Sequence, residues 1–233
     1  NDITDDFIYK TIYHDLVAQL TSLIQAVRST GTNDNLRNII IKDLLLHFED
    51  FDILYKFGKL NGWEETYPNY KTSISQLREE LSTSEAFHIW DHLAMRYEQI
   101  QLIGIFSSFT HDTEFKIILK HGLNIYNKQV NTLEQLALKL NVPLPNRPAL
   151  PVTSPIDPET ITDRFMYQMV LNLQLTSLDA HVRAIIETIK NEALRKLWSE
   201  FLNSEIEDYD KYLKYGKMKG WTRVIPIYGE PVT

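Results

Sequence analysis

Apolar side chains recur every three or four residues along most of this chain, which is the spacing of amphipathic α-helices. The spacing predicts helices over residues 4–29, 34–57, 84–107 and 113–140, and two more within 161–221. Gly31 fits the end of the first helix and Asn33 the cap of the second. The six prolines within residues 141–160 exclude a helix there. We therefore predict an all-α protein.

Part of this pattern occurs twice. Residues 161–221 repeat residues 3–63 without a gap, at a constant offset (221 − 63 = 158). The clearest segment reads Tyr-Leu-Lys-Tyr-Gly-Lys-Met-Lys-Gly-Trp over 212–221 and Leu-Tyr-Lys-Phe-Gly-Lys-Leu-Asn-Gly-Trp over 54–63. A repeat of this length indicates two copies of one helical hairpin.

The lengths of the connections predict how the helices are arranged. Short connections join antiparallel neighbours, whereas the proline-rich segment 141–160 is long enough to run the length of a helix. This pattern predicts a ferritin-like four-helix bundle, with one long crossover between its second and third helices. We predict a helical hairpin over 1–70, a linker over 71–82 and a complete four-helix unit over 83–233.

The N-terminal hairpin corresponds to the second half of another such unit. Its apolar inner faces have to be covered, so we expect either a longer tandem protein or a half-bundle that something else completes. Protein partners, or a second copy of the chain, are therefore expected to bind through this hairpin.

Composition and charge narrow the classes of function. The net charge is −7 and the basic residues are scattered, which argues against a nucleic-acid partner. The absence of cysteine excludes disulfides and thiolate chemistry. The apolar runs are far shorter than the roughly 20 residues of a membrane helix, and the acidic start is unlike a signal peptide. We expect a soluble, cytoplasmic protein without a membrane partner.

Few residues in the sequence are candidates to bind a metal ion. A ferritin-like di-iron site needs Glu-x-x-His on two helices, and this sequence has that spacing only in Glu85-Ala-Phe-His88, in the first turn of a helix. We predict no cofactor and no catalytic residue, with Fe, Mn or Zn as the alternative. The candidate metal ligands are His92, Glu134, His181 and Glu205. Because an unpaired buried carboxylate is costly, Glu205 alternatively pairs with a buried polar group such as His181 or a tyrosine hydroxyl.

Two further features have a functional and a structural interpretation. His88 and His92 are four residues apart and could chelate a metal at the surface with Asp91, but we favour a pair that flanks the core beside Trp90. The repeated Gly-Lys-x-x-Gly-Trp could present a cationic loop to a partner. We favour a structural role, in which both glycines permit a left-handed turn at the helix end. The lysine then lies at the negative end of the helix dipole, and the tryptophan packs back on the bundle.

Several motifs in combination resemble one known family. They are Ile89-Trp90-Asp91, Arg96-Tyr97, Phe109-Thr110-His111-Asp112, Leu133-Glu134, Pro143-Leu144-Pro145, Arg147-Pro148, Thr162-Asp163, Asn191, Leu194-Arg195 and the segment 215–221. The chain resembles an uncharacterised family of endospore-forming bacteria in the ferritin-like superfamily, commonly built as a tandem of two four-helix units and distantly similar to spore coat protein F. The resemblance covers 83–228 as a full unit and 1–70 as half of one. It implies a fold and a tandem architecture, and no catalytic residues.

These observations favour a non-enzymatic structural or interaction protein, with an association with the spore implied by the resemblance alone. The alternative is a metal-binding ferritin-like carboxylate protein with redox or storage activity. The buried carboxylates distinguish the two hypotheses, because they are satisfied by Arg, Tyr and His in the first and converge on an ion in the second. A third hypothesis, a carrier with a lipid or small ligand between its helices, has no signal beyond the abundant tyrosines.

Overall fold

The computed structural model describes residues 5–31, 33–63, 81–148 and 161–223, and these residues form six α-helices and no strand. The helices are α1 (Asp5–Ser29), α2 (Asp34–Asn61), α3 (Thr83–Phe109), α4 (Thr113–Lys139), α5 (Asp163–Glu187) and α6 (Glu192–Met218). The all-α prediction is confirmed. None of these helices is long and apolar enough to cross a membrane. Most of the predicted linker and crossover lies outside the described residues, so both stay predictions.

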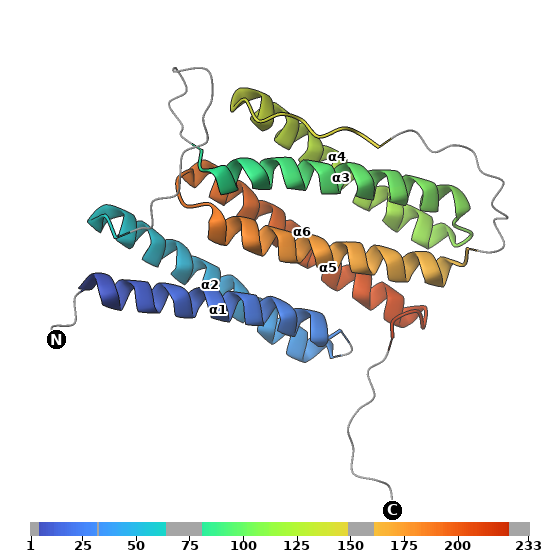
Figure 1. Cartoon of the computed structure of the whole chain (residues 1–233). Helices are drawn as coiled ribbons and strands as arrows, with labels where there is room; N and C mark the ends of the chain where they lie inside the picture. Colours follow the sequence, from blue (N-terminus) through green and yellow to red (C-terminus); the bar gives the residue numbers. More distant parts are fainter. Residues whose placement is uncertain (1–4, 32, 64–80, 149–160, 224–233) are drawn as a thin grey trace, which may run out of the picture.

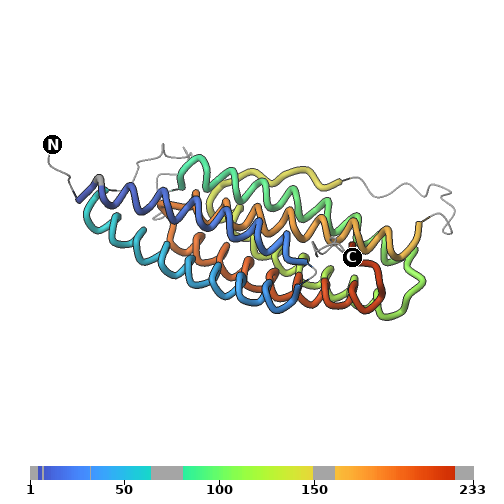
Figure 2. Tube along the Cα trace, turned by 90° about the horizontal axis from the view of Figure 1, so that it is seen from below, coloured from blue at the N-terminus to red at the C-terminus, as the bar shows by residue number. Residues whose placement is uncertain are grey.

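The helices pair as three antiparallel hairpins that lie side by side (Figure 1), and their axes run along one direction of an elongated bundle (Figure 2). The α5–α6 hairpin lies in the middle, with α1–α2 on one side and α3–α4 on the other. The Asp163 carboxylate at the start of α5 accepts backbone N–H bonds from His111 (3.1 Å) and Asp112 (2.8 Å) in the α3–α4 turn. Because α5 starts where α4 starts, these two helices run in the same direction.

Local signals set the helix ends. The side chains of Asn33 and Asn191 each accept the backbone N–H three residues on, which caps α2 and α6 at equivalent positions. Ser82 and Glu85 form a reciprocal capping box at the start of α3. These caps depend on residues close in sequence, and they position the helices that carry the buried side chains.

The two glycines of the repeated Gly-Lys-x-x-Gly-Trp segment have different roles. Gly220 has a φ of +68° and supplies the left-handed turn. Gly216 instead lies within α6, where the Tyr167 ring packs so closely that a Cβ atom would collide with it. The prediction that both glycines form the turn is therefore wrong for the first of them. Trp221 does pack back on the bundle, with its ring centroid 5.4 Å from that of Phe115. In the other copy of the repeat, Gly62 corresponds to Gly220, Gly58 to Gly216 and Tyr9 to Tyr167.

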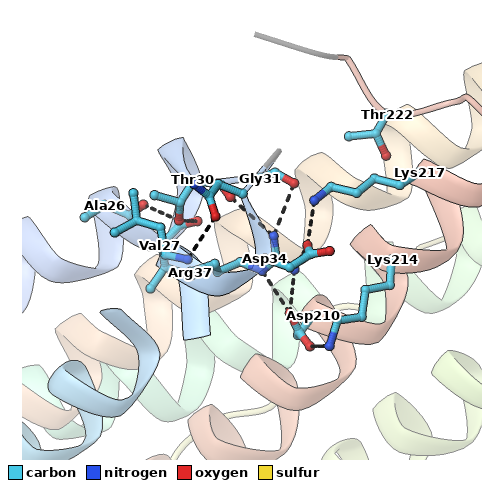
Figure 3. A network of polar contacts seen from close by, with 12 residues as sticks. Ala26, Val27, Thr30, Gly31, Asp34, Arg37, Asp210, Lys214, Lys217 and Thr222 are labelled. Atoms are coloured by element: carbon cyan, nitrogen blue, oxygen red, sulfur yellow. Dashed lines mark hydrogen bonds and ion pairs between the residues drawn. The ribbon is translucent and has the colours of Figure 1, made fainter. Parts of the chain in front are cut away.

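Residues 158 positions apart make matching contacts between α1–α2 and α5–α6. Arg37 Nη2 donates to Asp210 Oδ1 at 2.6 Å, and Arg195 Nη2 donates to Asp52 Oδ1 at 2.6 Å (195 − 37 = 158 and 210 − 52 = 158). Figure 3 shows the first of these pairs within its surrounding network of polar contacts. A second matching set comprises Lys217–Asp34 (2.5 Å) and Lys59–Glu192 (3.3 Å). The two hairpins therefore face each other across an approximate two-fold axis.

The buried face of α3 differs from the predicted one. The apolar periodicity of residues 84–107 predicts that Phe87 and Trp90 face inward, but they are 50% and 40% exposed, whereas Ile89 is fully buried. Two polar residues, His92 and Arg96, share the buried face. A prediction that follows apolar residues alone misplaces this face, because it excludes the positions that polar groups occupy.

Candidate functional site

A cluster of polar side chains lies inside the four helices α3–α6. It consists of His92, Arg96 and Gln99 from α3, Gln129 from α4, Ser177 and His181 from α5, and Glu205 from α6, and is called here the buried network. Each member is at most 4% exposed. Because every one of the four helices contributes, the network forms only when the two hairpins pack together.

The Arg96 guanidinium is the centre of the buried network. Its Nε donates to Gln129 Oε1 at 2.6 Å, and its Nη1 donates to Ser177 Oγ at 2.8 Å and to the side-chain oxygen of Gln99. Its Nη2 donates to Glu205 Oε1 and lies 2.9 Å from His181 Nε2. An arginine has five N–H donors, so each of them has an acceptor when His181 Nε2 carries no proton.

The two histidines of the network have proton positions that their contacts determine. His92 Nδ1 lies 2.8 Å from the His88 carbonyl oxygen, so it carries the proton and donates. In a neutral ring, His92 Nε2 is then the acceptor for His181 Nδ1, at 3.1 Å. This leaves His181 Nε2 without a proton and able to accept from Arg96. Burial lowers the pKa of both imidazoles, well below the usual value for His92, so both rings are neutral at pH 7.

Glu205 is the charged partner of Arg96. Burial alone would raise the pKa of its carboxyl, but the neighbouring Arg96 charge and the hydrogen bond from Gln129 lower it, to about 2. The carboxylate is therefore ionised throughout the neutral range. A buried carboxylate that a guanidinium neutralises is suited to hold the helices in register, and poorly suited to exchange protons near pH 7.

The structure brings together three of the four candidate metal ligands. His92, His181 and Glu205 all belong to the buried network, whereas Glu134 is separate and accepts from Tyr97 Oη and Arg147 Nη2, both at 2.5 Å. Within the described part of the chain, no group of three or more His, Asp and Glu residues is placed to hold a metal ion. The interpretation that Glu205 pairs with a buried polar group is confirmed, and its chief partner is an arginine.

His88 and His92 do not form a surface pair. They are 2% and 0% exposed, and His88 Nε2 lies 2.7 Å from Glu187 Oε2 at the end of α5. The alternative that the pair flanks the core beside Trp90 is also wrong, because both imidazoles lie on the buried face and Trp90 does not. The His92 ring instead packs against Trp198, with 4.3 Å between the ring centroids.

Sequence reasoning missed Arg96, Gln99, Gln129 and Ser177 as members of the network. A signal for the first two was present, because His92, Arg96 and Gln99 follow one another at spacings of four and three, on the same helix face as buried apolar residues. Polar residues at these spacings on a buried face indicate a network that other helices have to satisfy. No comparable local signal marks Gln129 or Ser177.

Acidification should destabilise the protein in two stages. The unfolded chain protonates its histidines near pH 6.5, whereas the folded protein keeps His92 and His181 neutral to lower pH, so stability should fall as the pH drops below about 6.5. Stability should fall again from about pH 4.5 towards pH 2, because Glu205 protonates more readily in the unfolded chain. Urea unfolding midpoints between pH 8 and pH 3 test this. His92→Leu should weaken the first stage, and a variant with an unchanged pH dependence there would contradict the assignment.

A cavity of about 440 Å³ adjoins the buried network between α4, α5 and α6. Glu205 and Tyr126 form part of its inner wall, and Asp208 and Lys211 lie nearer its rim. The network is thus a buried charged centre that has a cavity on one side.

The fold and this centre define the class of the protein as a helical bundle with a polar core. The chain belongs to the family described as protein of unknown function DUF3231, whose family profile matches residues 70–231. This confirms the predicted membership of a family of unknown function.

A solved structure with a similar fold is that of a candidate spore coat protein from Bacillus halodurans C-125, with a TM-score of 0.58 and 22% sequence identity. The similarity covers 64% of this chain and 96% of that chain. None of the curated proteins compared with this chain matches it. At this identity the similarity shows a shared helical-bundle fold. The ferritin-like assignment and the tandem organisation stay predictions.

Proposed function

We propose that this protein is a non-enzymatic structural protein of the spore, and that it assembles through the exposed face of α1–α2. In this proposal α3–α6 form a ferritin-like unit and α1–α2 the second half of another. The family of unknown function and the fold shared with a candidate spore coat protein support a connection with sporulation. The assembly role rests on the structure of α1–α2 itself.

The observation that carries the proposal is a contrast between the two copies of the repeated hairpin. Four apolar residues of α1–α2 are between 45% and 51% exposed, and they are Ile8, Ile12, Leu36 and Phe57. Their counterparts 158 residues on are at most 6% exposed, and they are Met166, Val170, Leu194 and Tyr215. The counterparts pack in cores to which α3 and α4 contribute. The same apolar face is therefore covered in one copy and exposed in the other.

The exposed face is suited to pack against a second copy of itself. At the positions of His181 and Glu205 it carries Leu23 and His47, and His47 Nε2 already lies 2.7 Å from Gln19 Oε1 within the hairpin. No partner arginine equivalent to Arg96 is needed. The α1–α2 hairpin of a second copy has the same length and the same exposed apolar residues, so a two-fold pairing would bury both faces in a four-helix arrangement.

Sedimentation velocity over a concentration series tests this assembly. The wild-type protein should form a dimer, and the double variant Ile12→Lys with Phe57→Lys should raise the dimer Kd about a hundredfold or more, because unpaired ammonium groups would be buried. Leu46→Lys is the matched control, since Leu46 is exposed on α2 and its counterpart Ser204 is exposed as well.

Both lysine variants change exposed positions and should retain their helical circular dichroism. A monomeric wild-type protein would overturn the proposal and leave the face to a different partner. A dimer that resists the double variant would also overturn it, because the dimer would then use another surface.

A further inference from the structure

The cavity beside the buried network results from a gap between two helices. The backbones of α4 and α6 do not approach each other as closely as those of the antiparallel pairs. The resulting space of about 440 Å³ is within the usual range for small-molecule sites. Its lining residues come from α4, α5 and α6.

One wall of this cavity is apolar and open. It is formed by Ile117, Ile118 and Ile125 from α4, with the side chain of Tyr126 deeper in. Gly122 is part of the same wall, and a Cβ atom at this position would meet no other atom within 4 Å. The missing side chain therefore enlarges the cavity instead of admitting a neighbouring residue.

Two buried acceptors in the cavity lining have no protein donor. Glu205 Oε2 and Gln174 Oε1 are both buried without a hydrogen-bond partner. Oε1 of Glu205 already accepts from Arg96 and Gln129, so Oε2 is the oxygen of this cavity-lining residue that is left without a donor. A buried acceptor without a partner costs about 1–3 kcal/mol. A ligand with N–H groups would satisfy both acceptors and remove this cost.

The charges around the cavity favour a cationic ligand over an anionic one. Glu205 is ionised at its inner end, and Asp208 lies closer to the rim with its side chain 18% exposed. His121 and Lys211 are 3.7 Å and 3.8 Å from Asp208, but their side chains are 66% and 70% exposed and point largely to solvent. Arg96 already balances the charge of Glu205. A carboxylate ligand would therefore add to the negative charge of Asp208, whereas an ammonium group would offset it.

We infer that this cavity binds a small organic amine. The amine N–H groups donate to Glu205 Oε2 and Gln174 Oε1, and the hydrocarbon part of the ligand contacts the isoleucine wall and the Tyr126 ring. This gives the hypothesis of a small-ligand carrier a specific cavity and a ligand class. It is independent of the assembly proposed for α1–α2, because none of these residues belongs to that face.

Isothermal titration calorimetry with three probes that share a 2-phenylethyl group tests the ligand class. 2-Phenylethylamine should bind the wild-type protein with a Kd of about 1 mM or tighter. 2-Phenylethanol, which lacks the charge, should bind about tenfold more weakly, and 3-phenylpropionate should show no binding. Equal affinities for the three probes, or no binding of the amine, would overturn the inference.

Three variants test the location of the site. Gly122→Leu should abolish binding of 2-phenylethylamine by filling the cavity, and Gln174→Leu should weaken it about tenfold by removing one acceptor. Gly104→Leu is the matched control, because Gly104 is also a helical glycine whose added Cβ atom would meet nothing within 4 Å, and it lies on α3 outside this cavity. Thermal melting curves of the three variants check that each of them is folded. Unchanged binding by folded Gly122→Leu would place the amine elsewhere and overturn the inference.

Discussion

Replacing Arg96 with methionine should lower the free energy of unfolding by about 3–5 kcal/mol, because it leaves the buried Glu205 charge without its counter-charge. Methionine fills much of the same volume, so the loss reports chiefly on the charge. The substitution also removes the donors that Gln129 and Ser177 use. Urea unfolding followed by circular dichroism measures the change.

Two controls separate this effect from ordinary loss of contacts. The double variant Arg96→Met with Glu205→Leu removes both charges and should recover most of the lost stability. Arg147→Met breaks the 2.5 Å ion pair with Glu134, but Arg147 is 67% exposed, so the cost should be at most about 1 kcal/mol. If Arg96→Met were no more costly than Arg147→Met, the buried network would not stabilise the fold as described.

The helices could be predicted from the sequence because their signals are local. The periodicity of apolar residues and the cap at Asn33 act over a few positions, and they place the start of α2 correctly. The pattern predicts that the second helix ends at residue 57, but α2 continues to Asn61, because Gly58 makes room for a tyrosine ring and does not end the helix.

The buried network could be predicted only in part because its contacts are long-range. Arg96 and Glu205 are 109 residues apart, and only the packing of α3 against α6 makes them partners. The sequence did indicate that Glu205 is buried and needs a polar partner. The helix directions also predict that Glu134 lies at the same level along the bundle as His92 and His181. That level does not determine where a side chain points, and the Glu134 side chain accepts from Tyr97 and Arg147.

The exposed face of α1–α2 shows a further limit of sequence patterns. Ile8 and Ile12 continue the apolar stripe of α1, so the pattern predicts that they are buried, yet they are 45% and 46% exposed. The apolar periodicity shows which side of a helix is suited to be buried. Whether a face is covered depends on which helices are present to pack on it.

Adding one methyl group at Gly216 is the other change with a large expected effect. A Cβ there would collide with the Tyr167 ring, which stacks on Tyr212 with centroids 4.7 Å apart and contacts Thr222 through its hydroxyl at 2.9 Å. Gly216→Ala should therefore lower the free energy of unfolding by about 3 kcal/mol, because the ring cannot move without losing these contacts. Chemical denaturation measures the loss.

A glycine-to-alanine substitution elsewhere in the chain should raise the free energy of unfolding instead of lowering it. Gly104→Ala adds a methyl group in α3 where no atom lies within 4 Å, and it should raise stability by up to about 1 kcal/mol through helix propensity. Tyr167→Ala supplies the second test, because in that background Gly216→Ala should lose its destabilising effect. Equal effects of Gly216→Ala and Gly104→Ala would contradict the packing role assigned to Gly216. Gly58→Ala should follow Gly216→Ala, since the Tyr9 ring occupies the corresponding space in the first hairpin.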